Sequence, residues 1–224
     1  MKRGQQCVVS LIFLASVVVL LSTSFVSAGL TDIFIIKDFF KKFFGIEKDV
    51  VKGPDSNYLA SYTFKLTNDK GKELPKNNVG HYQIKRGKDF FVNVYVNDLR
   101  SSQQRKGIFA AYASVVTQDN LITFVSNSLV IAPSFSPTKG SIITNTEGSY
   151  IDKAGGVHKD AFVSSSASQL LFRVKARAVT KGVESIAFVP ADYFPLHSKT
   201  LLKGKNEALT DDEIGYSIVE VAIV

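Results

Sequence analysis

The 224-residue chain is long enough for one large domain or two small ones. Its hydrophobic fraction of 45% and charged fraction of 21% are typical of a globular protein and exclude a disordered chain. The net charge is +7, but the basic residues occur singly or in pairs, as at Lys41-Lys42 and Lys85-Arg86, so we predict no nucleic-acid-binding arm. Cys7 is the only cysteine, which excludes an intramolecular disulfide.

Residues 1–28 have the pattern of a secretory signal peptide. Lys2 and Arg3 form a basic start, Val8–Leu21 is almost wholly apolar, and Val26-Ser27-Ala28 places small residues before Gly29. We therefore expect cleavage at Gly29 and a secreted or cell-surface protein. The alternative is an uncleaved signal anchor, because the 21 residues from Val8 to Ala28 reach the length that spans a bilayer.

Residues 29–54 are predicted to form a short amphipathic helix and a linker. Apolar residues recur every three or four positions, and Phe39, Phe40, Phe43 and Phe44 share one stripe. This face is expected to dock on the following domain or a partner, or to lie on a membrane surface as an extension of the anchor. Gly53-Pro54 ends the helix and marks the start of the globular domain at residue 55.

Residues 55–224 consist of strand-length units between turn signals. In Lys88–Leu99, Phe90 and the alternate valines form a dry face, while Phe91, Asn93, Tyr95 and Asn97 form a mixed face. Gly107–Thr117 is apolar on both faces, so we predict that these two strands are central. The other predicted strands are Tyr58–Leu66, Val79–Ile84, Leu121–Val125, Ser128–Ala132, Ser141–Asn145, Gln169–Val179, Val183–Val189, Thr200–Leu202 and Tyr216–Val224.

Two segments of this domain are predicted to lack strands. Pro133–Gly140 contains two prolines and is expected to be a loop, and the polar, glycine-rich Gly148–Lys159 is expected to be a long excursion. In Gln169–Val179, Leu171, Arg173, Lys175 and Arg177 are predicted to share a wet face. Short strands without a βαβ pattern predict an all-β fold, an antiparallel sandwich over residues 55–224.

The central strands resemble those of the cohesin-like modules of secreted bacterial proteins. The resemblance rests on Arg86–Leu99 followed by Gly107–Tyr112, on Leu171–Ala176 with Gly182 after it, on Pro190–Tyr193 and on the apolar last strand. It covers residues 57–224. It implies a nine-stranded, jelly-roll, Ig-type sandwich related to some carbohydrate-binding modules, in which one sheet face binds a dockerin helix pair.

Tyr95, Asn93 and Asn97 are the candidate ligand-binding residues, because a sugar ring stacks on an exposed aromatic side chain beside amide groups. Tryptophan is absent, so the aromatic candidates are Tyr58, Tyr62, Tyr82, Tyr95 and Tyr112. Tyr95 is the first choice since it shares the mixed face with both asparagines. Alternatively, the Tyr95 ring belongs to the core, and Asn93, Asn97 and Asp98 cap the turn after the strand.

No catalytic, metal or cofactor site is predicted. His81, His158 and His197 have no paired ligand spacing. A Ser-His-Asp site drawn from Ser164–Ser166 would lack the glycine pattern of a nucleophile elbow. Asp211-Asp212-Glu213 could bind calcium but lacks the alternating spacing of a known loop, so we interpret it as a solvated turn.

These features predict a secreted, non-enzymatic binding module for protein or polysaccharide recognition and assembly at the cell surface. A polysaccharide and a dockerin-like protein are the expected partners, with membrane contact through the Phe-rich helix. The alternative is a structural envelope protein tethered to the membrane by residues 8–28 and that helix. A polysaccharide-acting enzyme would need paired carboxylates in a groove, and no predicted strand places Asp or Glu two residues apart on one face.

Overall fold

The computed structural model describes residues 58–117, 119–145, 148–159, 168–189, 200–205, 207–210 and 213–224. The chain divides into two compact units, Met1–Asp49 and Val50–Val224, and all described residues belong to the second. The predicted signal segment at 1–28 and the helix and linker at 29–54, with Phe39, Phe40, Phe43 and Phe44, therefore lie outside the described residues. Within the described part, no helix has the length and apolar character needed to cross a membrane.

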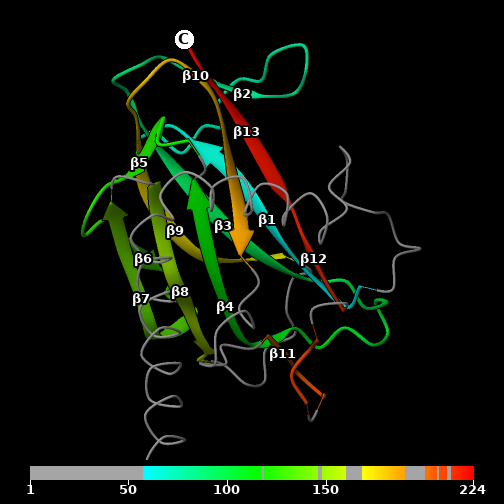
Figure 1. Cartoon of the computed structure of the whole chain (residues 1–224). Coiled ribbons are helices and arrows are strands. Elements are labelled where there is room, and N and C mark those ends of the chain that lie inside the picture. The colour runs from blue at the N-terminus through cyan, green and yellow to red at the C-terminus, as the bar shows by residue number, and fades with distance from the viewer. Residues whose placement is uncertain are drawn as a thin grey trace, which may run out of the picture. The chain divides into compact units, whose positions relative to one another are not determined.

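The described residues form two sheets packed as a β-sandwich, which confirms the predicted fold class (Figure 1). The six-stranded sheet has the order β12 (Ile214–Tyr216), β1 (Ala60–Thr67), β3 (Asp89–Asp98), β9 (Ser168–Ala178) and β5 (Ile122–Phe124), with β6 (Val130–Ile131) also paired to β9. The seven-stranded sheet has the order β2 (Tyr82–Ile84), β13 (Ile218–Ile223), β10 (Gly182–Val189), β4 (Ile108–Thr117), β8 (Gly148–His158) and β7 (Phe135–Asn145), with β11 (Leu201–Leu202) paired to β4.

The two strands predicted to be central occupy the interior of different sheets. β3 lies between β1 and β9, and β4 lies between β10 and β8. The inward side chains of β3, from Phe90 to Val96, are fully buried, as the alternation predicts. β4 is largely buried on both faces, with Phe109 the exception at 37% exposure.

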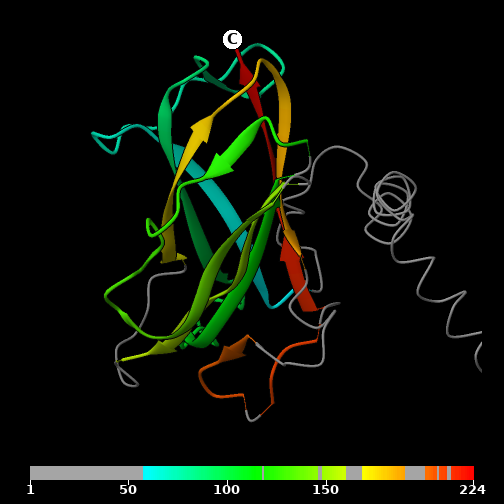
Figure 2. The same cartoon turned by 60° about the vertical axis from the view of Figure 1, so that its left-hand side comes forward.

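Two pairings differ from a purely antiparallel sandwich. β1 runs parallel to β12, and β13 runs parallel to β2. The described part of the chain also contains more strands than the nine that the resemblance implies, since short strands such as β2, β6 and β11 pair at the margins of the long ones. The C-terminus lies at one end of the sandwich, and β11 lies at the opposite end in both views (Figures 1 and 2).

The predictions for Pro133–Gly140 and Gly148–Lys159 are wrong, because these segments contribute to the long strands β7 and β8. The glycines of β8 allow neighbouring backbones to approach closely. A Cβ atom on Gly155 would lie 2.0 Å from the Ala111 carbonyl oxygen, and one on Gly156 would lie 2.0 Å from that of Ser136. The glycine-rich composition that is typical of a loop therefore allows the strands on both sides of β8 to pack closely against it.

The core contains an aromatic cluster that joins the two sheets. The rings of Phe64 on β1 and Phe188 on β10 stack with their centroids 4.0 Å apart, and Tyr62 stacks on Tyr216 at 5.6 Å. Tyr62 is fully buried, and its hydroxyl group is hydrogen-bonded to the Thr200 hydroxyl at 2.5 Å. Burial of such aromatic side chains contributes about 1.5–3 kcal/mol each, which fixes the sheets against each other.

Candidate functional site

The outer face of the six-stranded sheet carries all three residues predicted to bind a ligand. Asn93, Tyr95 and Asn97 alternate with the buried valines of β3, so their side chains leave the sheet on the side away from the core. Of the other tyrosines considered as ring platforms, Tyr62 and Tyr82 are 0% and 3% exposed. Tyr95 is half-buried and lies between the two asparagines along the strand.

The two asparagines link β3 to the neighbouring strand β1. The Asn93 amide donates to the Lys65 carbonyl oxygen at 2.8 Å and to the Thr67 hydroxyl at 3.0 Å. The Asn97 amide donates to the Ser61 carbonyl and hydroxyl oxygens at 3.2 and 3.1 Å. These bonds hold the face rigid around Tyr95. The ligand-binding role of Tyr95, Asn93 and Asn97 stays a prediction.

A row of cations lies on β9, the strand that pairs with β3 on the side opposite β1. Arg173, Lys175 and Arg177 occupy alternate positions of β9 and lie opposite Asn93, Phe91 and Asp89 respectively. Leu171 was expected on this face but is fully buried, because the register shifts between Val94 and Tyr95. Leu171 is the extra residue of this bulge, and its side chain therefore points into the core.

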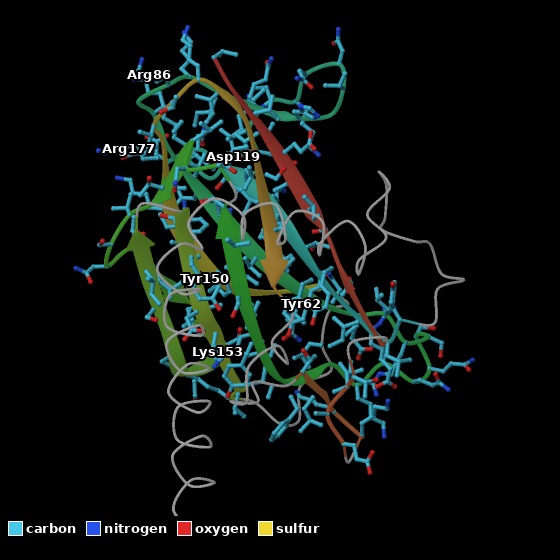
Figure 3. All side chains as sticks on the ribbon, in the orientation of Figure 1. Tyr62, Arg86, Asp119, Tyr150, Lys153 and Arg177 are labelled. Carbon is cyan, nitrogen blue, oxygen red and sulfur yellow. The ribbon has the colours of Figure 1, made fainter. Side chains whose placement is uncertain are left out.

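Asp89 pairs with two members of this row. Its carboxylate lies 2.7 Å from the Lys175 Nζ and accepts bonds from the Arg177 guanidinium at 2.7 and 3.1 Å. The Arg177 guanidinium and then the Lys175 ammonium group hold the pKa of Asp89 well below its usual range. Arg177 is exposed and lies near Arg86 at the end of the sandwich that carries the C-terminus (Figure 3).

Arg173 makes a different contact from the other two cations. Its guanidinium carbon lies 3.5 Å from the centroid of the Phe91 ring, which is a cation–π geometry. Its Nε atom is buried and has no hydrogen-bond partner among the residues that the structure describes. Among the described residues, no carboxylate lies within ion-pair distance of Arg173. The positive charge of Arg173 is therefore stabilised by a ring, and no acid of the described residues compensates it.

The loop after β3 is fixed by the buried carboxylate of Asp98. Asp98 accepts bonds from the Arg100 guanidinium at 2.9 and 2.6 Å and from the Gly107 amide at 2.9 Å. Burial raises the pKa of Asp98, but the bonds from Arg100 and Gly107 outweigh it and leave the pKa below its ordinary value. This confirms that Asp98 caps the turn, whereas the part played by Arg100 was not predicted.

Glu184 is a second buried carboxylate, and the sequence reading missed it. Its two oxygens accept the backbone N–H groups of Asp119 and Leu121 at 2.9 and 2.8 Å, so it holds the turn between β4 and β5. The two-residue alternation of side chains along β10 could have revealed that Glu184 is buried. Ile186 and Phe188 point into the core, and a residue two positions earlier must point the same way.

The described residues bring no metal-binding cluster together. None of them forms a group of three or more His, Cys, Asp or Glu side chains that could hold a metal ion. His81 pairs with Glu220, and His158 packs edge-on against Phe135. Glu213 of the acidic segment pairs with the Lys205 Nζ at 2.7 Å. His197, Ser164–Ser166, Asp211 and Asp212 lie outside the described residues.

Comparison with known proteins gives similar folds but no matching sequence family. No protein-family model and no curated protein matches the chain. A type I cohesin from a cohesin–dockerin complex of Clostridium thermocellum is 13% identical, with a TM-score of 0.42 over 73% of this chain and 99% of that one. A non-cellulosomal cohesin of Archaeoglobus fulgidus is 10% identical, with a TM-score of 0.37 over 73% and 91%.

A bacterial pilin also matches part of this chain in structure. The T6 backbone pilin of Streptococcus pyogenes is 14% identical, with a TM-score of 0.33 over 73% of this chain and 36% of that one. The β-sandwich fold of this chain rests on its own strand pairing. The identities are too low to carry a partner or a site across, so the function must be argued from the residues of this chain.

Proposed function

We propose that this chain is a non-catalytic binding module that recognises its partner on the outer face of its six-stranded sheet. The observation that supports this most strongly is the contact of Arg173 with Phe91, on a face that also presents Tyr95. Arginine and aromatic side chains dominate the binding energy of many interfaces. An arginine that no acid of the described chain compensates is available to pair with an acidic group of a partner.

The rigidity of this face favours recognition. The Asn93 and Asn97 amides lock β3 to β1, and Asp89 locks β3 to β9. A surface that is already ordered loses little conformational entropy when it binds, so more of the contact energy appears as affinity. A dockerin-like protein, as the sequence resemblance implies, and a cell-surface polysaccharide are the two partners to test.

Retention on the cell tests this proposal. Wild-type protein and variants are expressed in their own host, and the fractions on the cell surface and in the medium are measured. Tyr95→Ala combined with Arg173→Ala is expected to release the protein into the medium. The control combines Gln83→Ala with Lys106→Ala, both outside this face, and is expected to stay on the surface. Equal retention of both double variants contradicts the proposal.

We further infer secretion from the signal-like pattern of residues 1–28. N-terminal sequencing of the protein in each cell fraction tests it. A product that begins at Gly29 in the extracellular fraction supports secretion, and a membrane-bound product that begins near Met1 contradicts it.

The second candidate is a structural envelope protein tethered to the membrane. The apolar stretch from Val8 to Ala28 and the stripe of Phe39, Phe40, Phe43 and Phe44 favour it. Replacement of Phe40 and Phe43 by Ser is then expected to release the protein from the membrane fraction. If the Ser variant stays bound as the wild type does, the Phe-rich segment is not the anchor.

A further inference from the structure

The cations of β9 form a straight row along the outer face of the six-stranded sheet. Arg173, Lys175 and Arg177 are two residues apart, so neighbouring members are spaced by about 6.6–6.8 Å along the strand. β9 is paired on both sides, by β3 and by β5 and β6, and therefore holds these positions in line. Such a row matches an extended ligand that carries several anionic groups along its length.

The acidic residues of this face do not neutralise the row. Asp89 alone serves both Lys175 and Arg177, and Arg173 has no carboxylate partner among the described residues. On the far side of β3, Lys65 pairs with Glu73 at 3.4 Å. The row thus keeps an excess of positive charge, concentrated at Arg173.

The surroundings of Arg173 suit a sugar. The guanidinium lies over Phe91, so its flat fork is already oriented and little freedom is lost when it pairs with a carboxylate. Tyr95 is paired with Leu170, beyond the bulge, so it lies farther along the same face, on the side of Asn93 away from Phe91. A polymer that pairs with the Arg173 guanidinium can therefore place another of its sugar units against the half-buried Tyr95 ring.

We propose that this row binds an anionic polysaccharide built from carboxylate-bearing sugars, with Arg173 as the principal anion contact. The inference rests on the proposed function of this face and names the class of its partner. A linear polymer fits better than a folded acidic protein, because the three cationic residues follow one another along a single strand. Lys175 and Arg177 bind further carboxylates of the polymer, and each gives up part of its contact with Asp89 to do so.

The test uses polygalacturonate as the probe and the purified full chain. Binding is measured by calorimetry at about 50 mM and about 200 mM salt, since ion-pair contacts weaken as salt rises. The row variant combines Arg173→Gln, Lys175→Gln and Arg177→Gln. The charge-matched control combines Lys70→Gln, Lys72→Gln and Lys106→Gln, which are exposed cations outside the row.

The row variant is expected to bind at least about tenfold more weakly, and the control variant to change less than about twofold. Arg173→Lys keeps the charge but loses the planar stack, so it is expected to lie between the two. Equal losses in the two triple variants would mean that net charge alone attracts the polymer, which overturns the inference. Thermal unfolding of each variant excludes loss of the fold as the cause.

Three further probes test the chemistry of the partner. Fully methyl-esterified polygalacturonate is expected not to bind, because it lacks the carboxylates. Poly-L-glutamate and duplex DNA are expected to bind more weakly than polygalacturonate, and equal binding of either one overturns the assignment to a sugar polymer. If polygalacturonate fails but the surface-retention test succeeds, this inference is wrong and the proposed function stands.

Discussion

Arg173 lies directly opposite Asn93 in the pairing of β9 with β3, yet its guanidinium stacks on Phe91, two residues away, at 3.5 Å. Asn93 is itself bonded to the other neighbouring strand, β1. The arginine therefore turns along the strand to the nearest ring. This diagonal contact joins an apolar side chain to a charge that no acid of the described residues compensates.

Loss of the ring is expected to weaken both stability and binding. Phe91→Leu keeps an apolar side chain but removes the cation–π contact, so we predict a loss of about 0.5–1 kcal/mol in the free energy of unfolding. Polygalacturonate affinity should fall because the guanidinium is no longer oriented. Urea unfolding and calorimetry measure the two effects. Phe91→Tyr is the control, since it preserves the ring, and a Tyr variant as weak as the Leu variant would contradict the role of the stack.

Asn93 is expected to stabilise the sheet as well as the site. Asn93→Ala leaves the buried Thr67 hydroxyl and the Lys65 carbonyl without this donor, and we predict a loss of about 1–3 kcal/mol in unfolding free energy. Asn78→Ala, in an exposed loop, is the matched control and should change stability little. An Asn93 variant as stable as the Asn78 variant in urea unfolding would show that the link between β1 and β3 contributes nothing.

Asp98 is expected to make stability depend on pH in the acid range. Its pKa is below the ordinary value in the folded state, so its contribution is fully present above the unfolded-state pKa and is lost as pH falls through the folded pKa. Asp98→Asn should cost about 3 kcal/mol at pH 7, because it leaves the Arg100 guanidinium without its anion.

The pH dependence of the urea midpoint distinguishes Asp98 from an exposed acid such as Asp69. Urea midpoints of the wild type should fall between pH 7 and pH 3, and those of Asp98→Asn should fall less. Asp69→Asn, in an exposed turn, should follow the wild type. If Asp98→Asn loses as much stability on acidification as the wild type, the Asp98–Arg100 clamp is not the titrating element.

Glu184 is expected to matter through its two backbone bonds. Glu184→Gln turns one acceptor oxygen into an amide that faces the N–H groups of Asp119 and Leu121, so we predict a loss of about 1–3 kcal/mol. Hydrogen exchange at those two amides should become faster. Glu207→Gln, at an exposed position, is the control. Unchanged exchange at Leu121 in the Glu184 variant would contradict the capping role.

The sequence allowed the central strands and the sandwich to be predicted, because β3 alternates cleanly between core and surface. β8 could not be predicted in the same way. Gly155 and Gly156 are required there by the backbones of β4 and β7, and close approach of strands leaves no periodic signal in a single sequence. The bulge that buries Leu171 likewise depends on pairing with β3, not on local composition.

From the sequence, only the strand faces that carry the site residues could be predicted, and not their arrangement in the sheet. Period 2 places Asn93, Tyr95 and Asn97 together, and it places the cations of β9 together on another strand. That the two groups are neighbours follows from strand order, which the sequence does not contain. The stack of Arg173 on Phe91 and the capping bonds of Glu184 are contacts between distant segments, and only the folded chain reveals them.

Site-specific photo-cross-linking tests the central claim, that the outer face of the six-stranded sheet is the recognition surface, most directly. A photoreactive phenylalanine analogue replaces Tyr95 in one variant and Gln83 in another, the latter because it points outward from the seven-stranded sheet between the buried Tyr82 and Ile84. Both are expressed in the natural host and irradiated on intact cells. We predict an adduct from position 95 and none from position 83. An adduct from position 83 alone would contradict the account.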